Sequence, residues 1–396
     1  MIAAQITNGV YSLRALHWDR KLFDELVPLP DGTTYNAYLV IGSEKTALID
    51  TVLPVKGESL IAALKALGIE KLDYVVANHA EQDHSGSIPL ILQHYPEAKV
   101  VTNAKCRRFI MDTLPVERDA FIGVSDGQSL SLGDKTLNFM LTPWVHWPDT
   151  MITHVPEAGI VFTCDFMGAH LTTTELFAVD EPAAALAAKR YYAEIMMPYR
   201  AHSKAALERL LPLKPTYIAP SHGPVHNRPA FITGLYADWT SDAVRPTVLI
   251  PFVSMYESTA AMVDHLVDAL QMRGLNAKPV NVVEFDSGEF AMHLIDASTV
   301  VFASPTVLSN PHPSVTGAAV LINLLAPKTR FAAVMGSFGW DGDLPASIMG
   351  QLPRLNATWL EPVMIKGKAR GEALEEIDRL ANDIARANFG DRAVAA

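Results

Sequence analysis

Seven side chains that can bind a metal stand at the ends of four short apolar segments, and this placement constrains the fold more than any other feature of the sequence. Apolar runs of this length predict buried strands. A rigid scaffold usually displays its chemistry at strand ends and in the loops that follow them. The pattern therefore predicts a mixed sheet that carries a metal site. The seven residues are His79, Glu81, Asp83, His84, His146, Asp165 and His222.

Four of the seven fall within six residues, at 79–84, directly after the apolar segment 73–78. A lone histidine is more often a hydrogen-bonded structural residue than a ligand, but a set of this size at four strand ends indicates a shared site. Other apolar strands are expected at 36–42 and 45–51, and a helix at 58–69 that ends near Gly68.

The sequence pattern changes at 240–246. Five apolar strands then alternate with five helices, which predicts a parallel sheet with helices on both faces. We therefore predict two domains, at 1–245 and 246–396. The strands are expected at 247–252, 277–285, 298–305, 330–337 and 358–365, and the helices at 258–273, near 289, at 315–325, at 344–350 and in a final segment that ends near 389.

Charge and cysteine content exclude several classes of partner and site. The formal net charge is -11, whereas nucleic acids and anionic membranes bind basic surfaces, so neither is expected as a partner. Cys106 and Cys164 are the two cysteines and have no C-x-x-C spacing, so we expect no rubredoxin-type iron site, no thiolate zinc site and no disulfide. No signal peptide or apolar run long enough to cross a bilayer is evident, which favours a cytoplasmic protein.

The segment 79–84 reads H-x-E-x-D-H and resembles the metallo-β-lactamase superfamily, whose signature is H-x-H-x-D-H. Glu81 replaces the second histidine, and a hard carboxylate oxygen suits iron that changes its oxidation state. This is the version found in the flavodiiron family. The segments 29–40, 79–87, 146–151 and 191–199 also resemble that family, and the resemblance covers essentially the whole chain.

The resemblance implies a ligand set for two irons. One iron would be held by His79, Glu81 and His146, and the other by Asp83, His84 and His222. Asp165 would bridge the pair, which suits the roughly 3.5–4 Å separation of two-metal sites. His84 is a direct ligand in some members and is displaced by water in others.

Five further side chains are not assigned as ligands. His154, His170 and His226 are expected to surround the site or to lie at the surface; His226 follows His222 by four residues, but the S-H-G-P context assigns the ligand role to His222. His17 receives no role. Cys164 is expected to be a buried apolar neighbour.

The second domain carries three segments that together indicate a flavin site. The first, 253–259, joins a strand to a helix, where hydroxyl groups and free amides form a phosphate site. Taken alone, this segment is explained as well by capping of the helix by Ser258. The other two, 304–310 and 336–343, follow later strands at the edge where such sheets bind ligands, and they resemble the flavodiiron segments around the isoalloxazine ring. The residues expected to bind FMN are Ser254, Met255, Tyr256, Glu257, Ser258, Thr259, Ser304, Pro305, Thr306, Val307, Leu308, Asn310, Ser337, Phe338, Gly339 and Trp340.

One position departs from the family pattern. Glu257 stands where the family often has glycine, and a carboxylate beside a phosphate would repel it unless the side chain points into solvent. FMN remains the expected cofactor.

The resemblance implies an N-terminal metallo-β-lactamase-like αββα sandwich with two irons and a C-terminal flavodoxin-like domain with FMN. The expected activity is reduction of dioxygen to water, nitric oxide to nitrous oxide, or both. A head-to-tail homodimer, or a dimer of dimers, would bring the flavin of one chain to the irons of the other. The electron donor would be a separate rubredoxin, a flavin reductase or a reduced deazaflavin. Two alternatives stay open at this point: a dizinc hydrolase with an accessory flavodoxin module, and an electron carrier with a vestigial metal site.

Overall fold

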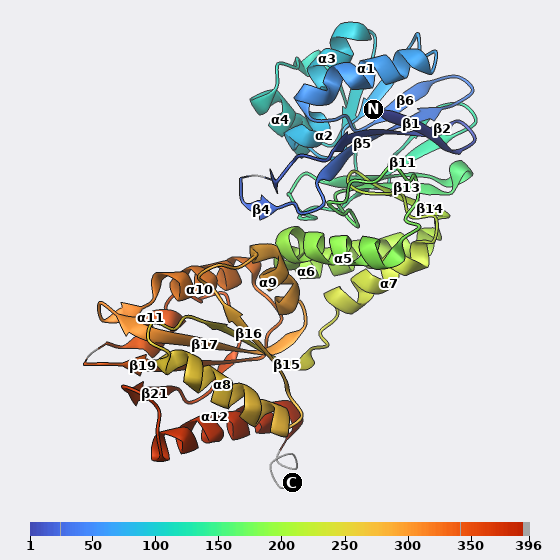
Figure 1. The fold of residues 1–396 in the computed structure, drawn as a ribbon. Coiled ribbons are helices and arrows are strands. Elements are labelled where there is room, and N and C mark those ends of the chain that lie inside the picture. Colours follow the sequence, from blue (N-terminus) through green and yellow to red (C-terminus); the bar gives the residue numbers. More distant parts are fainter. Residues whose placement is uncertain (24, 341, 391–396) are drawn as a thin grey trace. The chain divides into compact units, whose positions relative to one another are not determined.

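The structure, a computed structural model, describes residues 1–23, 25–340 and 342–390. The chain divides into two compact units, Met1–Ser241 and Asp242–Ala396, which are described separately (Figure 1). Within the described residues, no helix combines the length and the apolar character that are needed to cross a membrane.

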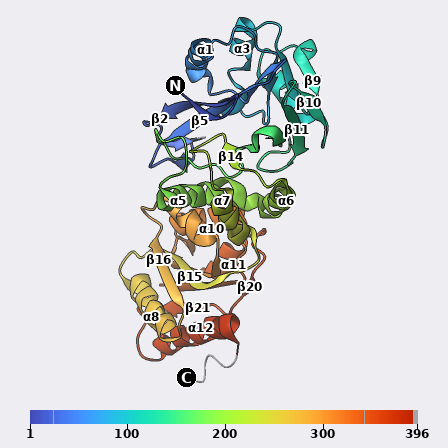
Figure 2. The same ribbon diagram turned by 90° about the vertical axis from the view of Figure 1, so that its right-hand side faces the viewer.

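Two stacked sheets form the centre of the first unit, with helices on both outer faces (Figures 1 and 2). The first sheet has the order β1-β2-β5-β6-β7-β8-β9 and the second has the order β10-β11-β12-β13-β14. This layering confirms the predicted αββα sandwich. The strands of the first sheet are β1 (Ile2–Thr7), β2 (Val10–His17), β5 (Thr33–Ile41), β6 (Thr46–Ile49), β7 (Tyr74–Val76), β8 (Lys99–Thr102) and β9 (Phe121–Gly123). Those of the second are β10 (Ser129–Ser131), β11 (Thr136–Leu141), β12 (Met151–Val155), β13 (Ile160–Cys164) and β14 (Tyr217–Pro220).

The alternation of side chains along β5 shows why its second half, residues 37–41, is apolar. Ala37 and Leu39 pack into the core beneath the helices, whereas Tyr38 and Val40 pack into the core between the sheets. Successive side chains of a strand point to opposite faces, so the part of a strand that is packed against a core on both faces is apolar at consecutive positions. The helices of this unit are α1 (Gly57–Ala66), α2 (Gln82–Ser85), α3 (Ile88–His94), α4 (Ala104–Thr113), α5 (Glu181–Tyr191), α6 (Arg200–Leu210) and α7 (Pro229–Thr240).

Two further local details belong to the first unit. A small hairpin, β3 (Leu22–Phe23) and β4 (Val27–Pro28), precedes β5. Helix α1 ends as expected near Gly68, which has a φ of 74°. Glycine adopts this left-handed conformation without the steric cost that other residues meet, and it commonly ends helices.

The second unit is a parallel sheet with the order β16-β15-β17-β19-β20 and with β21 also paired to β19. Helices α8 and α12 cover one face and α9, α10 and α11 lie on the other, which confirms the predicted doubly wound sheet (Figure 1). Its strands are β15 (Arg245–Phe252), β16 (Asn276–Asn281), β17 (Ala297–Val307), β18 (Asn310–Pro311), β19 (Phe331–Phe338), β20 (Thr358–Trp359) and β21 (Val363–Lys366). Its helices are α8 (Ser258–Met272), α9 (Ser287–Leu294), α10 (Pro313–Leu325), α11 (Leu344–Met349) and α12 (Glu372–Phe389).

Three boundaries in this unit differ from the sequence-based prediction. The strand expected at 277–285 ends at Asn281. The strand expected at 358–365 is split into β20 and β21, and Pro362, which has no amide hydrogen to donate to a neighbouring strand, lies in the break. The segment 304–310 is not a loop: β17 continues to Val307 and pairs back with β18.

Candidate metal and flavin sites

The structure brings the seven predicted metal-binding side chains together in one cluster of the first unit. They come from the loops after β7, β11, β13 and β14 and from helix α2. Because the two sheets pack face to face, the ends of β7 in one sheet and of β13 and β14 in the other meet above the shared core. The cluster divides into one group with His79, Glu81, His146 and Asp165 and a second with Asp83, His84 and His222.

In the first group, one carboxylate oxygen lies between two imidazoles. Glu81 Oε2 is 3.1 Å from His79 Nε2 and 3.2 Å from His146 Nε2. The Glu81 and His146 side chains retain 12% and 15% exposure, whereas His79 is fully buried. The side of the cluster formed by Glu81 and His146 is therefore the one that solvent and small molecules can reach.

The second group repeats this arrangement deeper in the fold. Asp83 Oδ2 is 3.1 Å from His222 Nε2, and Asp83 Oδ1 is 3.3 Å from His84 Nε2. Both Asp83 oxygens are buried, and neither accepts a hydrogen bond of acceptable geometry from any described residue. Buried polar atoms without partners are rare, and carboxylate oxygens of this kind at a ligand-rich site fit the binding of a cation.

Asp165 lies between the two groups and presents one oxygen to each. Its Oδ2 is 3.8 Å from His79 Nε2 and 3.5 Å from His146 Nε2. Its Oδ1 is 2.9 Å from His84 Nε2 and 3.4 Å from His222 Nε2. A carboxylate in this position can bridge two cations.

The pKa values of the histidines and carboxylates in the cluster indicate an environment that favours cations. Burial alone would lower the pKa of His146 and His222, but the nearby carboxylates of Asp165 and of Glu81 or Asp83 outweigh it and raise these pKa values to about 9 and about 10. The pKa of Asp165 is well below its usual range, because the nearby imidazoles outweigh the opposing effect of burial. Carboxylates that hold protons on imidazoles at this spacing also attract metal cations, which compete with protons for the same nitrogen atoms. The residues therefore fit a pair of metal ions.

Three groups that orient the ligands were not predicted from the sequence. Asp149 Oδ2 lies 3.2 Å from His79 Nδ1 and accepts a hydrogen bond of 2.8 Å from the Ala80 amide. The carbonyl oxygen of Thr34 is 2.6 Å from His222 Nδ1. The Tyr191 hydroxyl donates a 2.9 Å hydrogen bond to Asp165 Oδ1. Metal-binding histidines usually donate their second ring N–H to such acceptors. Asp149 could have been found, because it lies three residues after His146 in a segment that resembles the family.

We expect Asp149→Asn to weaken iron binding by roughly 10–100-fold, because the amide does not carry the charge that orients and polarises His79. Competition with a chelator measures the effect. Asp268→Asn, an exposed change of the same chemistry on α8, is the matched control and should leave iron affinity unchanged. Equal affinities of the two variants would show that Asp149 does not support the site.

The other histidines contribute no donor atom to the two groups. His170 Nδ1 is 2.9 Å from the Thr33 hydroxyl, and its ring centroid lies 4.9 Å from that of His222. His226 is buried with Nε2 3.3 Å from the Met167 carbonyl oxygen, and burial lowers its pKa to about 4. His154 is half-buried on β12, and His17 lies at the end of β2, where its Nδ1 is 3.5 Å from the Tyr35 hydroxyl.

Cys164 lies closer to the cluster than the sequence indicated. It is buried, its Sγ is 3.9 Å from Asp165 Oδ2, and it could form a third group with His84 and Asp165. Burial and the Asp165 charge raise the pKa of the thiol well above its usual range. A thiol that keeps its proton is a poor metal ligand, since the thiolate is the binding form. Cys164 is therefore a buried neighbour of the site, and its exclusion from the ligand set stays a prediction.

In the second unit, a depression of about 230 Å³ lies at the carboxyl ends of β15, β17 and β19. It contains residues from each of the three predicted segments and also Gly367, which the sequence did not indicate. The lining residues are Met255, Tyr256, Ser258, Thr259, Pro305, Thr306, Ser337, Phe338, Gly339, Trp340 and Gly367. Asp341, in the third predicted segment, lies outside the described residues.

The chemistry of this depression fits a flavin mononucleotide. Ser258 and Thr259 bring hydroxyl groups and first-turn amides to the N-terminus of α8, and such amides have no partner within the helix. Tyr256 and Trp340 are 84% and 82% exposed, so their rings offer apolar surface that a bound isoalloxazine ring could cover.

The remaining predicted flavin residues support the walls of the depression. Ser254 Oγ accepts a 3.1 Å hydrogen bond from the Ala260 amide and so ties the turn to α8. Ser304 Oγ accepts a 2.9 Å hydrogen bond from the His312 amide. Val307 pairs with Asn310 across the hairpin turn, at which Leu308 is 89% exposed.

The structure also accounts for the unusual Glu257. It is the N-cap residue of α8 with a φ of 63°, so the capping that was considered for Ser258 is wrong, since Ser258 is the first helical residue. A left-handed conformation favours glycine, and a residue with a Cβ atom pays about 1–2 kcal/mol for it. The residue is exposed, so the carboxylate can avoid a phosphate at the helix N-terminus.

Comparisons with known proteins find similar sequences and folds along the whole chain. The family model of the ODP family beta lactamase matches residues 33–223. The nitric oxide reductase of Moorella thermoacetica is 33% identical, over 96% of this chain and 97% of the relative. The solved structure of rubredoxin oxygen:oxidoreductase from Desulfovibrio gigas has a TM-score of 0.93 at 28% identity and 100% coverage of both chains. The flavodiiron protein from Giardia intestinalis has a TM-score of 0.91 at 26% identity, over 99% of this chain and 98% of that chain.

Proposed function

Because the chain belongs to the flavodiiron protein family, we propose that this oxidoreductase reduces dioxygen, nitric oxide or both at a diiron centre supplied with electrons by FMN. The observation that carries the proposal is the position of Asp165, whose two oxygens face two separate groups of imidazole and carboxylate ligands. A hydrolase finds no support among these relatives, which are named as oxidoreductases.

We propose the following assignment of the ligands. His79, Glu81 and His146 hold one iron, Asp83, His84 and His222 hold the other, and Asp165 bridges them. The grouping of the donor atoms and the unpartnered oxygens of Asp83 support this assignment. His84 is included as a direct ligand because its Nε2 lies 2.9 Å from the bridging oxygen Oδ1 of Asp165.

We further propose that residues 1–245 form the diiron domain and residues 246–396 the FMN domain. The depression at the carboxyl end of the second sheet supports the flavin assignment. The last six residues of the chain, 391–396, lie outside the described residues.

Two ferrous ions and one reduced FMN together hold four electrons, enough with four protons to convert dioxygen to two waters, while two electrons and two protons convert two nitric oxide molecules to nitrous oxide and water. The protein side chains position the metal ligands and shield part of the cluster from solvent. Tyr191 keeps its proton, since burial and Asp165 raise its pKa well above the usual range, and its hydroxyl holds Asp165 by a hydrogen bond. Glu81 and His146 leave the cluster open to a small gas while the second group stays dry.

The remaining partners are part of the proposal. A head-to-tail homodimer, alone or within a dimer of dimers, would cover the exposed Tyr256, Leu308 and Trp340 around the flavin depression. The electron donor is a separate rubredoxin, flavin reductase or reduced deazaflavin; a structurally similar protein is named rubredoxin oxygen:oxidoreductase.

Turnover with each gas, added in a known amount to an otherwise anaerobic reaction, tests the function directly. The protein, loaded with iron and FMN and supplied with NADH and a flavin reductase, should consume dioxygen, or convert nitric oxide to nitrous oxide, or both. Removal of iron or of FMN should abolish the reaction. If the fully loaded protein consumes neither gas, while its zinc-loaded form hydrolyses a lactam or ester, the proposed function is wrong.

A further inference from the structure

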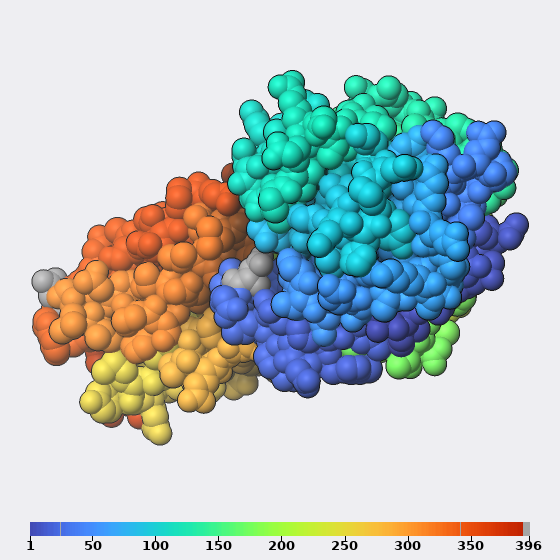
Figure 3. Space-filling model, turned by 90° about the horizontal axis from the view of Figure 1, so that it is seen from above, coloured from blue at the N-terminus to red at the C-terminus, as the bar shows by residue number. Residues whose placement is uncertain are grey.

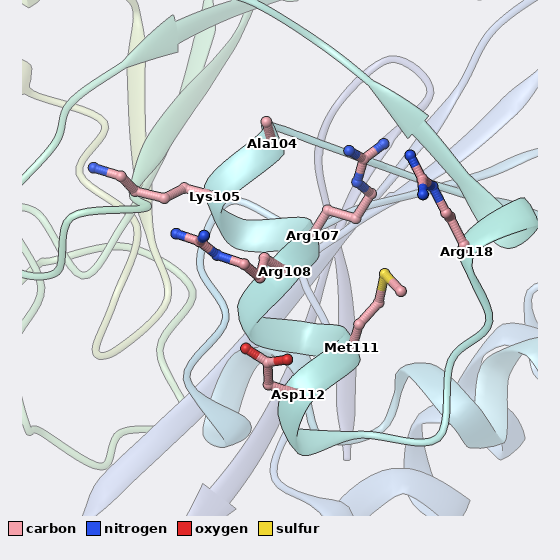
Figure 4. A pocket seen from close by; sticks show the side chains of 7 residues that line it. All are labelled: Ala104, Lys105, Arg107, Arg108, Met111, Asp112 and Arg118. Carbon is pink, nitrogen blue, oxygen red and sulfur yellow. The ribbon is translucent and has the colours of Figure 1, made fainter.

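A basic depression of about 550 Å³ lies beside helix α4, on the outer surface of the first unit. Lys105, Arg107 and Arg108 come from the helix, and Arg118 comes from the turn that follows it (Figure 4). The guanidinium groups of Arg107 and Arg118 point toward the same space, and the Met111 side chain lies below them in the view (Figure 4). The segment around residue 110, cyan-green by the colour bar, belongs to the surface seen in Figure 3.

The four cations have no ion-pair partner among the described carboxylates within 4.0 Å. No salt bridge joins Lys105, Arg107, Arg108 or Arg118 to an acidic group of the described chain, although Asp112 lines the same depression. The segment 104–118 carries four basic and two acidic residues, hence a net charge of +2, in a chain whose net charge is -11. Unpaired cations grouped along one surface helix of an acidic protein form an attractive region for a negatively charged partner.

Two sets of contacts connect helix α4 to residues around the metal cluster. Asn103, which caps α4, donates a 2.6 Å hydrogen bond from Nδ2 to the carbonyl oxygen of Asp149, the residue that orients His79. Phe109 of α4 lies 6.5 Å from Trp147 between ring centroids, and Trp147 lies 4.8 Å from His79. In the proposed head-to-tail dimer the flavin of the partner chain meets the irons of this unit, so a protein that binds to α4 is held on the unit to which that flavin delivers its electrons.

We propose that the α4 face, made of Lys105, Arg107, Arg108, Met111 and Arg118, is the docking surface for a small electron-donor protein with a carboxylate-rich face. The inference rests on the proposed function, which requires an external donor. Three observations favour a protein over a small anion. The cations project to both sides of α4 in Figure 4, Met111 is 39% exposed among them, and Lys105, Arg108 and Arg118 are exposed to solvent. Weak electron-transfer interfaces combine a small apolar contact with opposite charges at the rim.

The contrast between the negative net charge of the chain and the positive α4 face would orient an approaching donor. A donor with a negative charge is repelled by a chain of net charge -11 at most orientations. A local cluster of unpaired cations selects the orientation in which the donor meets α4, and this steering raises the association rate. Docking should therefore weaken steeply with ionic strength, because exposed charges are screened within about 10 Å at 0.1 M salt.

The test is binding of an acidic rubredoxin to the holoenzyme, measured by calorimetry at low and at high salt. Arg107→Glu with Arg118→Glu should weaken binding at low salt by at least about 10-fold and flatten its salt dependence. Lys65→Glu with Lys204→Glu is the matched control, since it changes the net charge equally at exposed positions of α1 and α6. The control should weaken binding by less than about 3-fold.

Three results would overturn the proposal: no salt-sensitive binding of rubredoxin by the unaltered protein, equal losses in both double variants, or competitive displacement of rubredoxin from α4 by inorganic pyrophosphate at equal concentration. The last result would assign the face to small anions. Gas reduction driven by reduced methyl viologen, a cationic donor, separates this proposal from the proposed function. All variants should keep that activity, and its absence in the unaltered protein would contradict the function itself.

Discussion

Asp165→Ala should remove the diiron centre and leave FMN in place. Among the described residues, Asp165 alone places a carboxylate oxygen within 4 Å of each of the four imidazoles, so in the proposed ligand set its loss removes a ligand from both irons at once. Iron content and gas reduction should fall further than the roughly 10–100-fold that loss of an orienting partner costs. Flavin absorbance should stay the same, because the flavin depression belongs to the other unit. Metal analysis and absorption spectra of the purified variant measure both.

Two further variants keep this test interpretable. Asp165→Asn retains the size of the side chain but lacks the charge, and it should also lose iron. Glu58→Ala, an exposed change on α1, should retain iron and activity. If Asp165→Ala folds, as shown by circular dichroism, and still holds two irons, the proposed ligand set is wrong at its centre.

Two inactive variants should restore activity when they are reassembled into heterodimers. One lacks FMN because Ser254, Ser258 and Thr259 are replaced by bulky acidic residues. The other lacks iron because His79 and Asp165 are replaced by alanine. In a head-to-tail dimer, one of the two equivalent interfaces then joins an intact flavin to an intact diiron centre, so each heterodimer should show about half of the normal activity.

The control for reassembly is each variant dissociated and reassembled alone, which should stay inactive. Native mass spectrometry establishes how much heterodimer is present. Confirmed heterodimers without activity would favour electron transfer within one chain. That result would contradict the head-to-tail arrangement but not the diiron chemistry.

The metal cluster was predictable because its members are chemically distinctive and stand at strand ends. His79, Glu81, Asp83 and His84 needed little beyond local spacing, and Glu81 itself indicated iron. Asp149, Tyr191 and Thr34 were missed, since their roles come from hydrogen bonds across more than 25 residues of chain or from a main-chain carbonyl. A backbone acceptor has no signal in the sequence.

The second flavin segment, 304–310, was predicted to follow a strand, but most of it is itself strand. β17 turns back through Leu308 and Ser309, with φ values of 50° and 61°, and forms a hairpin with β18. Neither residue is a usual choice for a left-handed turn, so local propensity gave no sign of it. Glu257 adopts a glycine-like conformation for which the sequence likewise gave no evidence. Strained backbone of this kind is concentrated at binding sites.

Metal and flavin content of the purified protein tests the central claim most directly. Protein from iron-replete cells, never exposed to excess zinc, should hold close to two irons and about one FMN per chain, since the cluster has two groups of ligands around one bridging carboxylate. Elemental analysis by plasma mass spectrometry, together with the flavin absorbance of the released cofactor, gives both numbers. Stoichiometric zinc with little iron would contradict the account.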